Sequence, residues 1–293
     1  MTSSWRADAY ATLLRWCRER ELVRLRKEAG LPRPWTADLV LREWRFCCVS
    51  RERDRETRWV ARNWRDPRTS SPALWHNLVV AVLCRRSATL AELGFQETWD
   101  PERFVRVLEG RPRGEAFGAA YVVPGGPGGA TKARWLADAC LTPLWEAHVN
   151  GTEPPEARPG DGPACAAWAR FLRMRAAGLG PFLANQVVAD LRRTRYLSAA
   201  DDWGCFVLCG PGTLRGLDRL AGRPLGSSQD GKAAREEVLR VRDALQRDAP
   251  ELERELEDPN DTANCLCEYD KYARALEGGR PKRRYMPSAE PLP

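Results

Sequence analysis

The chain has 293 residues, of which 47 are Lys or Arg and 40 are Asp or Glu, so its formal net charge is +7 and its pI is near 9.0. A chain of this length can bury the core of one large domain or of two smaller ones, and its basic balance suits a polyanionic partner. No apolar run approaches bilayer length and residues 1–10, MTSSWRADAY, lack the apolar core of a signal peptide, so we expect a soluble, intracellular protein without a membrane partner.

Helical periodicity dominates the chain. Apolar residues recur at helical spacing in 10–17 and in 238–245, and again after Pro250. Only the short apolar run 119–123 has the character of a strand. Gly and Pro interrupt the pattern at 124–129, and the sequence is therefore typical of a mainly α protein.

A second Gly/Pro-rich interruption, NGTEPPEARPGDG at 150–162, is the best candidate for a linker. It predicts two helical lobes, at 1–150 and at 163–277. The tail 278–293 is basic, and we expect it to be poorly ordered. Its cations Lys282, Arg283 and Arg284 are candidates for contact with phosphate.

Ten cysteines without a secretion signal indicate reduced thiols rather than a disulfide framework. The close pairs are Cys47 with Cys48, Cys205 with Cys209, and Cys265 with Cys267. None of these pairs has the CxxC spacing of a zinc site, and the four-cysteine loop of an iron–sulfur cluster is missing. We expect buried, inert cysteines and no metal site.

Arginines are regularly spaced in the segment 45–64. Arg51, Arg55, Arg58 and Arg62 are four, three and four residues apart, which predicts four guanidinium groups on one helical face. One interpretation is a phosphate cradle, because the planar guanidinium binds two oxygens at once. The other is a solvated face on which Asp54 and Glu56 pair with the arginines.

Residues 171–188, FLRMRAAGLGPFLANQVV, carry the most informative pattern. Gly178-Leu179-Gly180 is followed four positions later by Ala184, within an apolar frame on both sides. A turn with two glycines lets a backbone approach phosphate, and the following helix N-terminus offers unpaired N–H groups. The pattern predicts a DNA-binding helix-hairpin-helix, and the alternative is an ordinary helical turn.

Three later segments could carry chemistry. Asp201-Asp202 either caps a helix or supplies a carboxylate in the place where helix-hairpin-helix DNA glycosylases have a catalytic aspartate. The segment 209–216, CGPGTLRG, is either a structural turn or an anion site, and it lacks the GK[ST] ending of a nucleotide-binding loop. Glu268 and Lys271 are one helical turn apart, which alone indicates an ordinary surface pair.

Together these segments resemble the alpha-glutamyl/putrescinyl thymine pyrophosphorylases, the amino acid:DNA transferases of phage thymidine hypermodification. The resemblance lies in six segments, taken in order: 18–41, 45–59, 115–132, 177–191, 201–220 and 265–279. It implies a helical, DNA-glycosylase-like core that acts on thymine already hydroxymethylated and pyrophosphorylated at its 5-methyl carbon. An amine such as glycine, glutamate or putrescine would replace the pyrophosphate, and extrusion of the base from the duplex is expected.

The resemblance also implies roles for individual residues. An incoming amine must lose a proton, and Asp202 is the first candidate for the general base, with Asp201 as its neighbouring alternative and Glu268 as the second candidate. Lys271 completes the catalytic set. The candidates for binding the pyrophosphate and substrate are Arg51, Asp54, Arg55, Arg58, Lys132, Gln186 and Arg215. The candidates for DNA binding are Gly178, Leu179, Gly180, Gly210 and Gly212.

Three positions qualify the resemblance. Phe182 stands where lyase-type glycosylases carry lysine, so Schiff-base strand cleavage is not expected. Asn185 and Cys47-Cys48 depart from the family's pattern, which puts the identity of the substrate in doubt rather than the family.

The expected partners are DNA with pyrophosphorylated 5-hydroxymethyluracil and a free amino acid or polyamine, in the cytoplasm of a phage-infected bacterium. No cofactor is expected, and assistance by a divalent cation such as Mg²⁺ is left open. Two rival functions stay open. One is a DNA glycosylase, and the other is a non-catalytic DNA-binding accessory domain of a 5-hydroxymethyluracil DNA kinase.

Overall fold

The computed structural model describes residues 5–119, 121, 123, 125–126, 129–281 and 284–285, and the mainly α fold class is confirmed. No β-strand occurs within these ranges; a single antiparallel bridge pairs Trp44 with Arg284. The chain divides into two compact units. Unit 1 comprises Met1–Asp54 and Gly204–Pro293, and unit 2 comprises Arg55–Trp203.

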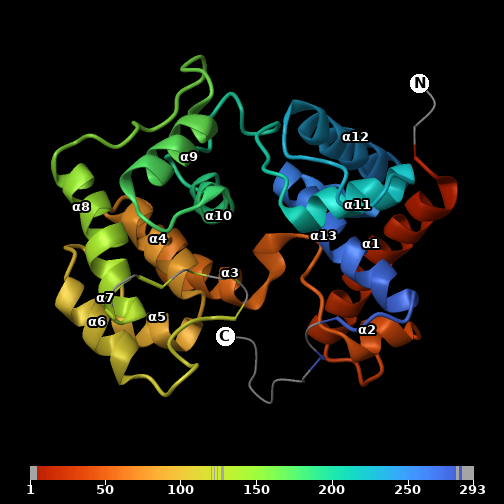
Figure 1. Cartoon of the computed structure of the whole chain (residues 1–293), viewed down its shortest axis with the longest axis horizontal. Helices are drawn as coiled ribbons and strands as arrows, with labels where there is room; N and C mark the ends of the chain where they lie inside the picture. Colours follow the sequence, from red (N-terminus) through yellow and green to blue (C-terminus); the bar gives the residue numbers. More distant parts are fainter. Residues whose placement is uncertain are drawn as a thin grey trace. The chain divides into compact units, whose positions relative to one another are not determined.

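Unit 1 is built around one long C-terminal helix. Its helices are α1 (Ala7–Glu28), α2 (Leu39–Glu43), α11 (Pro211–Ala221), α12 (Lys232–Asp248) and α13 (Pro259–Leu276), with 3-10 turns at Arg51–Arg53, Pro250–Leu252 and Arg254–Leu256. α13 contacts all four other helices and lies among α1, α11 and α12 in Figure 1. Trp16 and Tyr272 are among the fully buried side chains of this core.

Two glycines set the close approach of α11 to α13. A Cβ at Gly212 would lie 2.2 Å from the Sγ of Cys267, and a Cβ at Gly216 would lie 2.3 Å from the carbonyl oxygen of Leu266. Any larger residue at either position would therefore push the two helices apart. This packing accounts for part of the 209–216 motif without a ligand.

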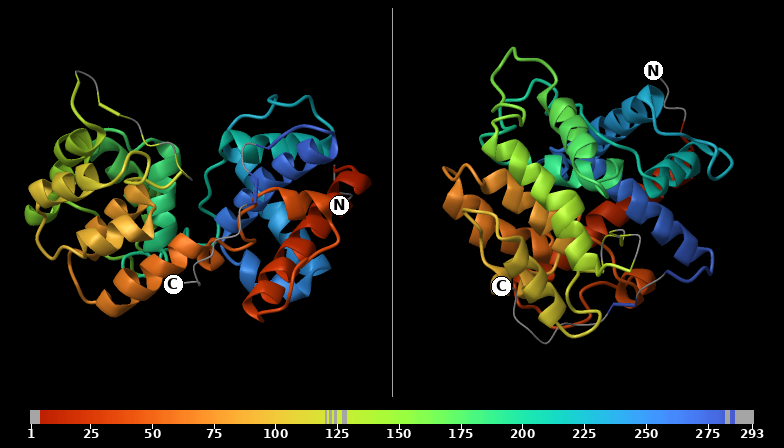
Figure 2. Two further views of the ribbon diagram at one scale, coloured as in Figure 1. Left: turned by 90° about the horizontal axis from the view of Figure 1, so that it is seen from below. Right: turned by 60° about the vertical axis from the view of Figure 1, so that its left-hand side comes forward.

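Unit 2 surrounds a helix that is buried on all sides. Its helices are α3 (Arg55–Val60), α4 (Leu74–Cys84), α5 (Ser87–Leu93), α6 (Pro101–Gly110), α7 (Lys132–Leu136), α8 (Thr142–Val149), α9 (Ala164–Arg175) and α10 (Pro181–Leu191), with a 3-10 turn at Asp66–Arg68. Every residue of α4, LWHNLVVAVLC, is buried, as its apolar composition on all faces requires. π-Helical turns occur at Ala61–Arg65 and Ala137–Leu141, and the second joins α7 and α8 into one yellow-green helix in Figure 2.

His76 shows what the second π-helical turn provides. Its Nε2 lies 2.9 Å from the carbonyl oxygen of Leu141, the last residue of that turn. Burial lowers the pKa of His76 to about 4, so the imidazole is neutral at physiological pH. The neutral ring then donates Nε2–H to the carbonyl.

The two units do not follow the predicted boundary at 150–162. That segment lies inside unit 2, where the carboxylate of Asp201 accepts hydrogen bonds from the N–H groups of Gly160 and Gly162, each at 3.0 Å. The chain divides instead after Asp54 and after Trp203. Composition could not indicate this division, because a linker between domains and a loop held by hydrogen bonds within one domain can both be rich in Gly and Pro.

Part of the predicted basic tail is in place. The N–H of Tyr285 donates to the carbonyl of Glu43 at 2.8 Å, and Arg284 lies 3.5 Å from the carboxylate of Glu43. The candidate phosphate contacts Lys282 and Arg283 lie outside the described residues, as do Ala120 and Val122 of the predicted strand.

The structure also bears on disulfides, metal binding and membrane crossing. The ten cysteines all fall within described ranges; none is in a disulfide, and seven are buried. No group of three His, Cys, Asp or Glu side chains in the described part of the chain is arranged to hold a metal ion. None of the helices resolved in the described ranges combines the length and the hydropathy needed to cross a bilayer.

Candidate functional site

The predicted hairpin joins α9 to α10 through residues 176–180. Gly178 has φ +88°, a left-handed conformation that favours glycine, and Leu179 is only 3% exposed. Gly180 is the N-cap of α10, and Pro181 occupies its first turn. Ala184 is fully buried, as a small residue at the contact of two helices should be. These residues form the turn because each meets a local backbone requirement.

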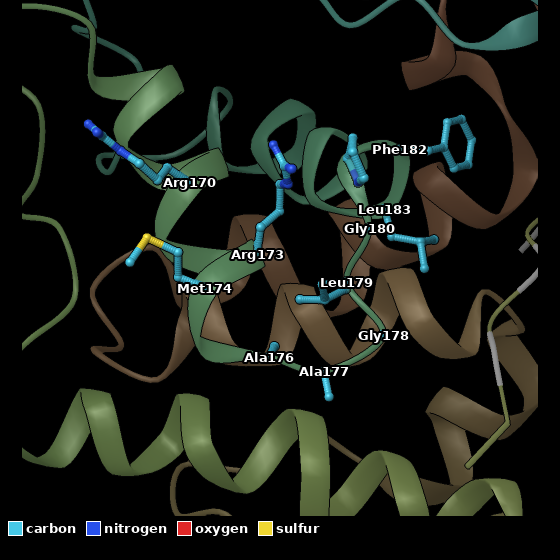
Figure 3. A pocket seen from close by; sticks show the side chains of 11 residues that line it. Arg170, Arg173, Met174, Ala176, Ala177, Gly178, Leu179, Gly180, Phe182 and Leu183 are labelled. Carbon is cyan, nitrogen blue, oxygen red and sulfur yellow. The ribbon is translucent and has the colours of Figure 1, made fainter. Parts of the chain in front are cut away.

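The hairpin presents groups that suit an anion. The amide N–H groups of Gly178 and Gly180 donate to no protein carbonyl within the described ranges. A groove of about 820 Å³ lies at the turn, lined by α9 side chains on one side and by Phe182 on the other (Figure 3). Backbone N–H groups at the start of a helix are a common site for phosphate.

Three arginines near the end of α9 add positive charge. Arg170, Arg173 and Arg175 are exposed, and none of them forms an ion pair with any residue that the structure describes. Cations at a helix C-terminus also offset the helix dipole, so their position has a structural benefit. Sequence reasoning missed these residues, although the spacing of 170 and 173 in a helix that ends at the hairpin was a usable signal.

Asp202 caps a helix. Its Oδ1 accepts from the N–H of Cys165 at 2.9 Å and its Oδ2 from the N–H of Ala166 at 3.0 Å, in the first turn of α9. The carboxylate of Asp201 accepts hydrogen bonds from the N–H groups of Gly160 and Gly162 in the loop before α9, and these hydrogen bonds lower its pKa. The geometry therefore favours the capping interpretation over a carboxylate open to substrate, and the catalytic role of Asp202 stays a prediction.

The predicted continuous arginine face is wrong. Ser50 caps a 3-10 turn at Arg51–Arg53, Asp54 is extended with ψ 141°, and a new helix begins at Arg55. Arg51 is buried in unit 1, where its backbone N–H donates to Asp261 at 2.8 Å. Arg55, Arg58 and Arg62 belong to unit 2, on α3 and the π-helical turn that follows it. The break arises because a buried carboxylate from α13 captures the chain at Arg51.

Unit 1 does bring two of the predicted segments together. Residues 46–54 cross α13, and the Oε2 of Glu268 accepts from the N–H of Cys47 at 3.1 Å and from the Nζ of Lys271 at 2.9 Å. The Oδ1 of Asp54 accepts from the N–H of Cys48 at 3.0 Å. Candidates from both segments thus share one cluster.

The Glu268–Lys271 pair is not the surface pair that its spacing suggests. Glu268 is 7% exposed, and the Nζ of Lys271 lies 4.4 Å from the ring centroid of Phe46. Burial, with the neighbouring carboxylate of Glu268, raises the pKa of Cys47 well above its usual range. Cys47 is therefore a neutral thiol at physiological pH.

The 209–216 motif is a helix start rather than an open turn. Gly210 is the N-cap of α11, and Gly212 packs against α13. Arg215 donates its Nε to Asp270 at 2.9 Å, and Arg219 donates to the other oxygen of the same fully buried carboxylate. The geometry gives Gly212 and Arg215 structural roles, and their predicted contacts with DNA and pyrophosphate are not needed to explain them.

Lys132 and Gln186 both contact the loop that follows α6 in unit 2. The Nζ of Lys132 lies 4.4 Å from the ring centroid of Phe117, and burial lowers the pKa of this lysine. The hydroxyl of Tyr121 donates to the Oε1 of Gln186 at 2.7 Å. Sequence reasoning had no pattern that could link Tyr121 to residue 186.

Comparison with known proteins gives one match. Residues 7–279, which span both units, match the family model described as the 5-hmdU DNA kinase helical domain. No curated protein and no solved structure gives a significant match to the chain.

Proposed function

The chain belongs to the 5-hmdU DNA kinase helical-domain family, and on that premise we propose that it replaces the pyrophosphate of pyrophosphorylated 5-hydroxymethyluracil in DNA with an amine. Family membership links the chain to the modification of 5-hydroxymethyluracil in DNA. The more specific transfer is supported by the six segments that resemble thymine pyrophosphorylases.

We assign DNA binding to the hairpin of unit 2, and the lining of the groove at this hairpin is the observation that carries the proposal. Gly178 and Gly180, whose N–H groups have no protein acceptor in the described part of the chain, line one groove with the exposed Arg170 and Arg173. The exposed Arg175 is the last residue of α9, directly before the turn. Such a surface binds the phosphate backbone whatever the sequence of the DNA. It does not by itself select the modified base.

The transfer step needs a proton acceptor and a cation. The amine nitrogen attacks the 5-methylene carbon, the bond from that carbon to the pyrophosphate oxygen breaks, and the amine proton passes to a carboxylate. We assign the proton to Glu268 ahead of Asp202, because both oxygens of Asp202 already bind the amides of α9. Lys271, 2.9 Å from Glu268, supplies positive charge for the departing pyrophosphate.

The family match favours a second candidate function. The matched model is the helical domain of a kinase, and the sequence lacks the GK[ST] ending of a nucleotide-binding loop. In that role residues 7–279 would hold hydroxymethyluracil DNA while a nucleotide site outside these residues served the kinase reaction. The chain would then have no transfer activity of its own.

One assay separates the candidates. DNA carrying 5-hydroxymethyluracil, with or without its pyrophosphate, is incubated with a panel of amines, and its nucleosides are analysed by mass spectrometry. Amine-dependent loss of pyrophosphate is the expected result. Release of free base would indicate a glycosylase instead. Binding with no change in the nucleosides would overturn the transferase and leave the accessory role.

A further inference from the structure

Phe182 is unusual among the aromatic residues of this protein. It is 49% exposed, and within the described ranges no other Phe, Trp or Tyr is exposed to this degree. Leaving an aromatic ring in water forgoes the stabilisation that its burial would give. The ring lines the groove at the hairpin together with Arg170 and Arg173, so a ligand in that groove would contact it.

The ring of Phe182 is held in place from one side. The ring of Tyr121 meets it nearly at a right angle, with 5.2 Å between centroids and 82° between planes. The hydroxyl of Tyr121 donates to Gln186, one helical turn after Phe182 on the same face of α10. Tyr121 thus bridges two positions of α10.

A buried arginine fixes Tyr121 in turn. The guanidinium of Arg85 lies 5.2 Å from the ring centroid of Tyr121 and donates to the Oγ1 of Thr57 at 2.7 Å. Arg85 is buried and is the one non-glycine residue with a positive φ, at 44°, in the described part of the chain. A short chain of contacts therefore runs from the buried end of α4 to an exposed ring.

The position of Phe182 identifies the chemistry of its partner. It lies two residues after the N-cap glycine of the hairpin, and Figure 3 shows its ring projecting from the start of α10 on the side away from Arg170 and Met174. A nucleotide whose phosphate is held by the N–H groups of the turn has its base one sugar away from that phosphate, on the surface next to the turn. Rings beside cationic grooves bind unpaired bases by stacking.

We propose that Phe182, braced by Tyr121, stacks on an unpaired base of the DNA strand held at the hairpin. The inference rests on the proposed DNA binding of unit 2, and it is independent of amine transfer. Stacking on the flat face of a base does not read its sequence, so the contact discriminates unpaired from paired DNA rather than one base from another.

The test compares two duplexes of the same sequence, one fully paired and one carrying a single unpaired 5-hydroxymethyluracil. Alanine in place of a stacking aromatic costs about 1–3 kcal/mol per base, which is about 5- to 150-fold in Kd. Phe182→Ala should weaken binding of the unpaired duplex by a factor in that range and leave the paired duplex unchanged. Phe182→Trp should retain both affinities.

Val149→Ala is the matched control, because Val149 is a 68% exposed apolar side chain of unit 2, at the end of α8, that does not line the groove. It should change neither affinity. Tyr121→Phe keeps the ring and removes the hydroxyl bond to Gln186, so it should weaken only the unpaired duplex, and by less than Phe182→Ala does.

The outcomes separate this inference from the proposed function. Equal weakening of both duplexes by Phe182→Ala, or no weakening of either, would overturn the stacking role while amine transfer could still be observed. Selective weakening without any transfer by the wild-type protein would support stacking and refute the transferase. A wild-type protein that binds neither duplex would overturn the stacking role and the assignment of DNA binding to the hairpin.

Discussion

The arginines at the hairpin make a quantitative prediction about salt. If Arg170, Arg173 and Arg175 each neutralise one phosphate of duplex DNA, replacing all three with alanine removes three contacts. Each contact contributes about 0.9 to the slope of log Kobs against log salt concentration. The triple variant should therefore have a slope smaller in magnitude by about 2.7.

That slope has a consequence for affinity. A change of 2.7 in slope means that raising the salt fourfold weakens wild-type binding about 40-fold more than it weakens binding of the variant. Fluorescence anisotropy with a labelled duplex, titrated at several salt concentrations, measures both slopes. Because the three side chains are exposed, the variant should lose only their interaction with the helix dipole, about 0.3–1 kcal/mol per charge in the last turn, and should unfold slightly below the wild-type temperature.

A matched triple variant controls for net charge. Arg103, Arg106 and Arg113 are also exposed in unit 2, on or just after α6, and their replacement by alanine removes the same three charges. This control should keep most of the wild-type slope. If both triple variants lose the same slope, the hairpin arginines act only through the overall charge, and the assignment of DNA binding to this groove is refuted.

Three further predictions concern single positions. Gly178→Ala should lower the free energy of unfolding by about 1–2 kcal/mol, because its φ of +88° is left-handed. Gly180 has φ −65° and open space around it, so Gly180→Ala should leave the melting temperature unchanged but weaken DNA binding if phosphate approaches its backbone. Glu268→Gln should abolish amine transfer, measured by nucleoside mass spectrometry, and leave DNA affinity unchanged. Asp202→Asn should chiefly lower the free energy of unfolding, by about 1 kcal/mol, because it weakens the cap of α9. The opposite pattern in mass spectrometry and thermal melts would restore Asp202 as the base. His76 has a pKa of about 4 in the folded protein, below its value in the unfolded chain. Its contribution to the free energy of unfolding is therefore fully present above about pH 6.5 and falls by about 2 kcal/mol between pH 7 and pH 5. Denaturant unfolding at the two pH values should show this loss, and His76→Gln should reduce it.

The sequence predicts the turn between α9 and α10 well and the polar cluster of unit 1 poorly. Gly178, Gly180 and Pro181 meet backbone requirements that are local, so a short pattern is enough to place the turn. The i,i+3 spacing of Glu268 and Lys271 is equally local, but their burial depends on residues 46–54, more than two hundred positions away. A surface pair and a buried pair read alike in the sequence.

The arginine segment 45–64 also depends on a contact with a residue that is distant in the sequence. Its periodicity predicts one helix, and helical spacing does hold from Arg55 onward. The helix cannot extend back through Arg51, because Asp261 of α13 binds the N–H of Arg51 and the Oγ of Ser50. Such a capture by a distant carboxylate leaves no trace in the local pattern.

The discontinuous make-up of unit 1 has a consequence for synthesis on the ribosome. Residues 5–54 emerge long before the helix around which they pack, because α13 begins only at Pro259. The whole of unit 2 is a continuous insertion that can fold in the interval. The apolar face of α1, with Trp16 at its centre, therefore stays exposed until α13 has been synthesised, which makes this nascent segment a natural client for chaperones that shield unfolded chains.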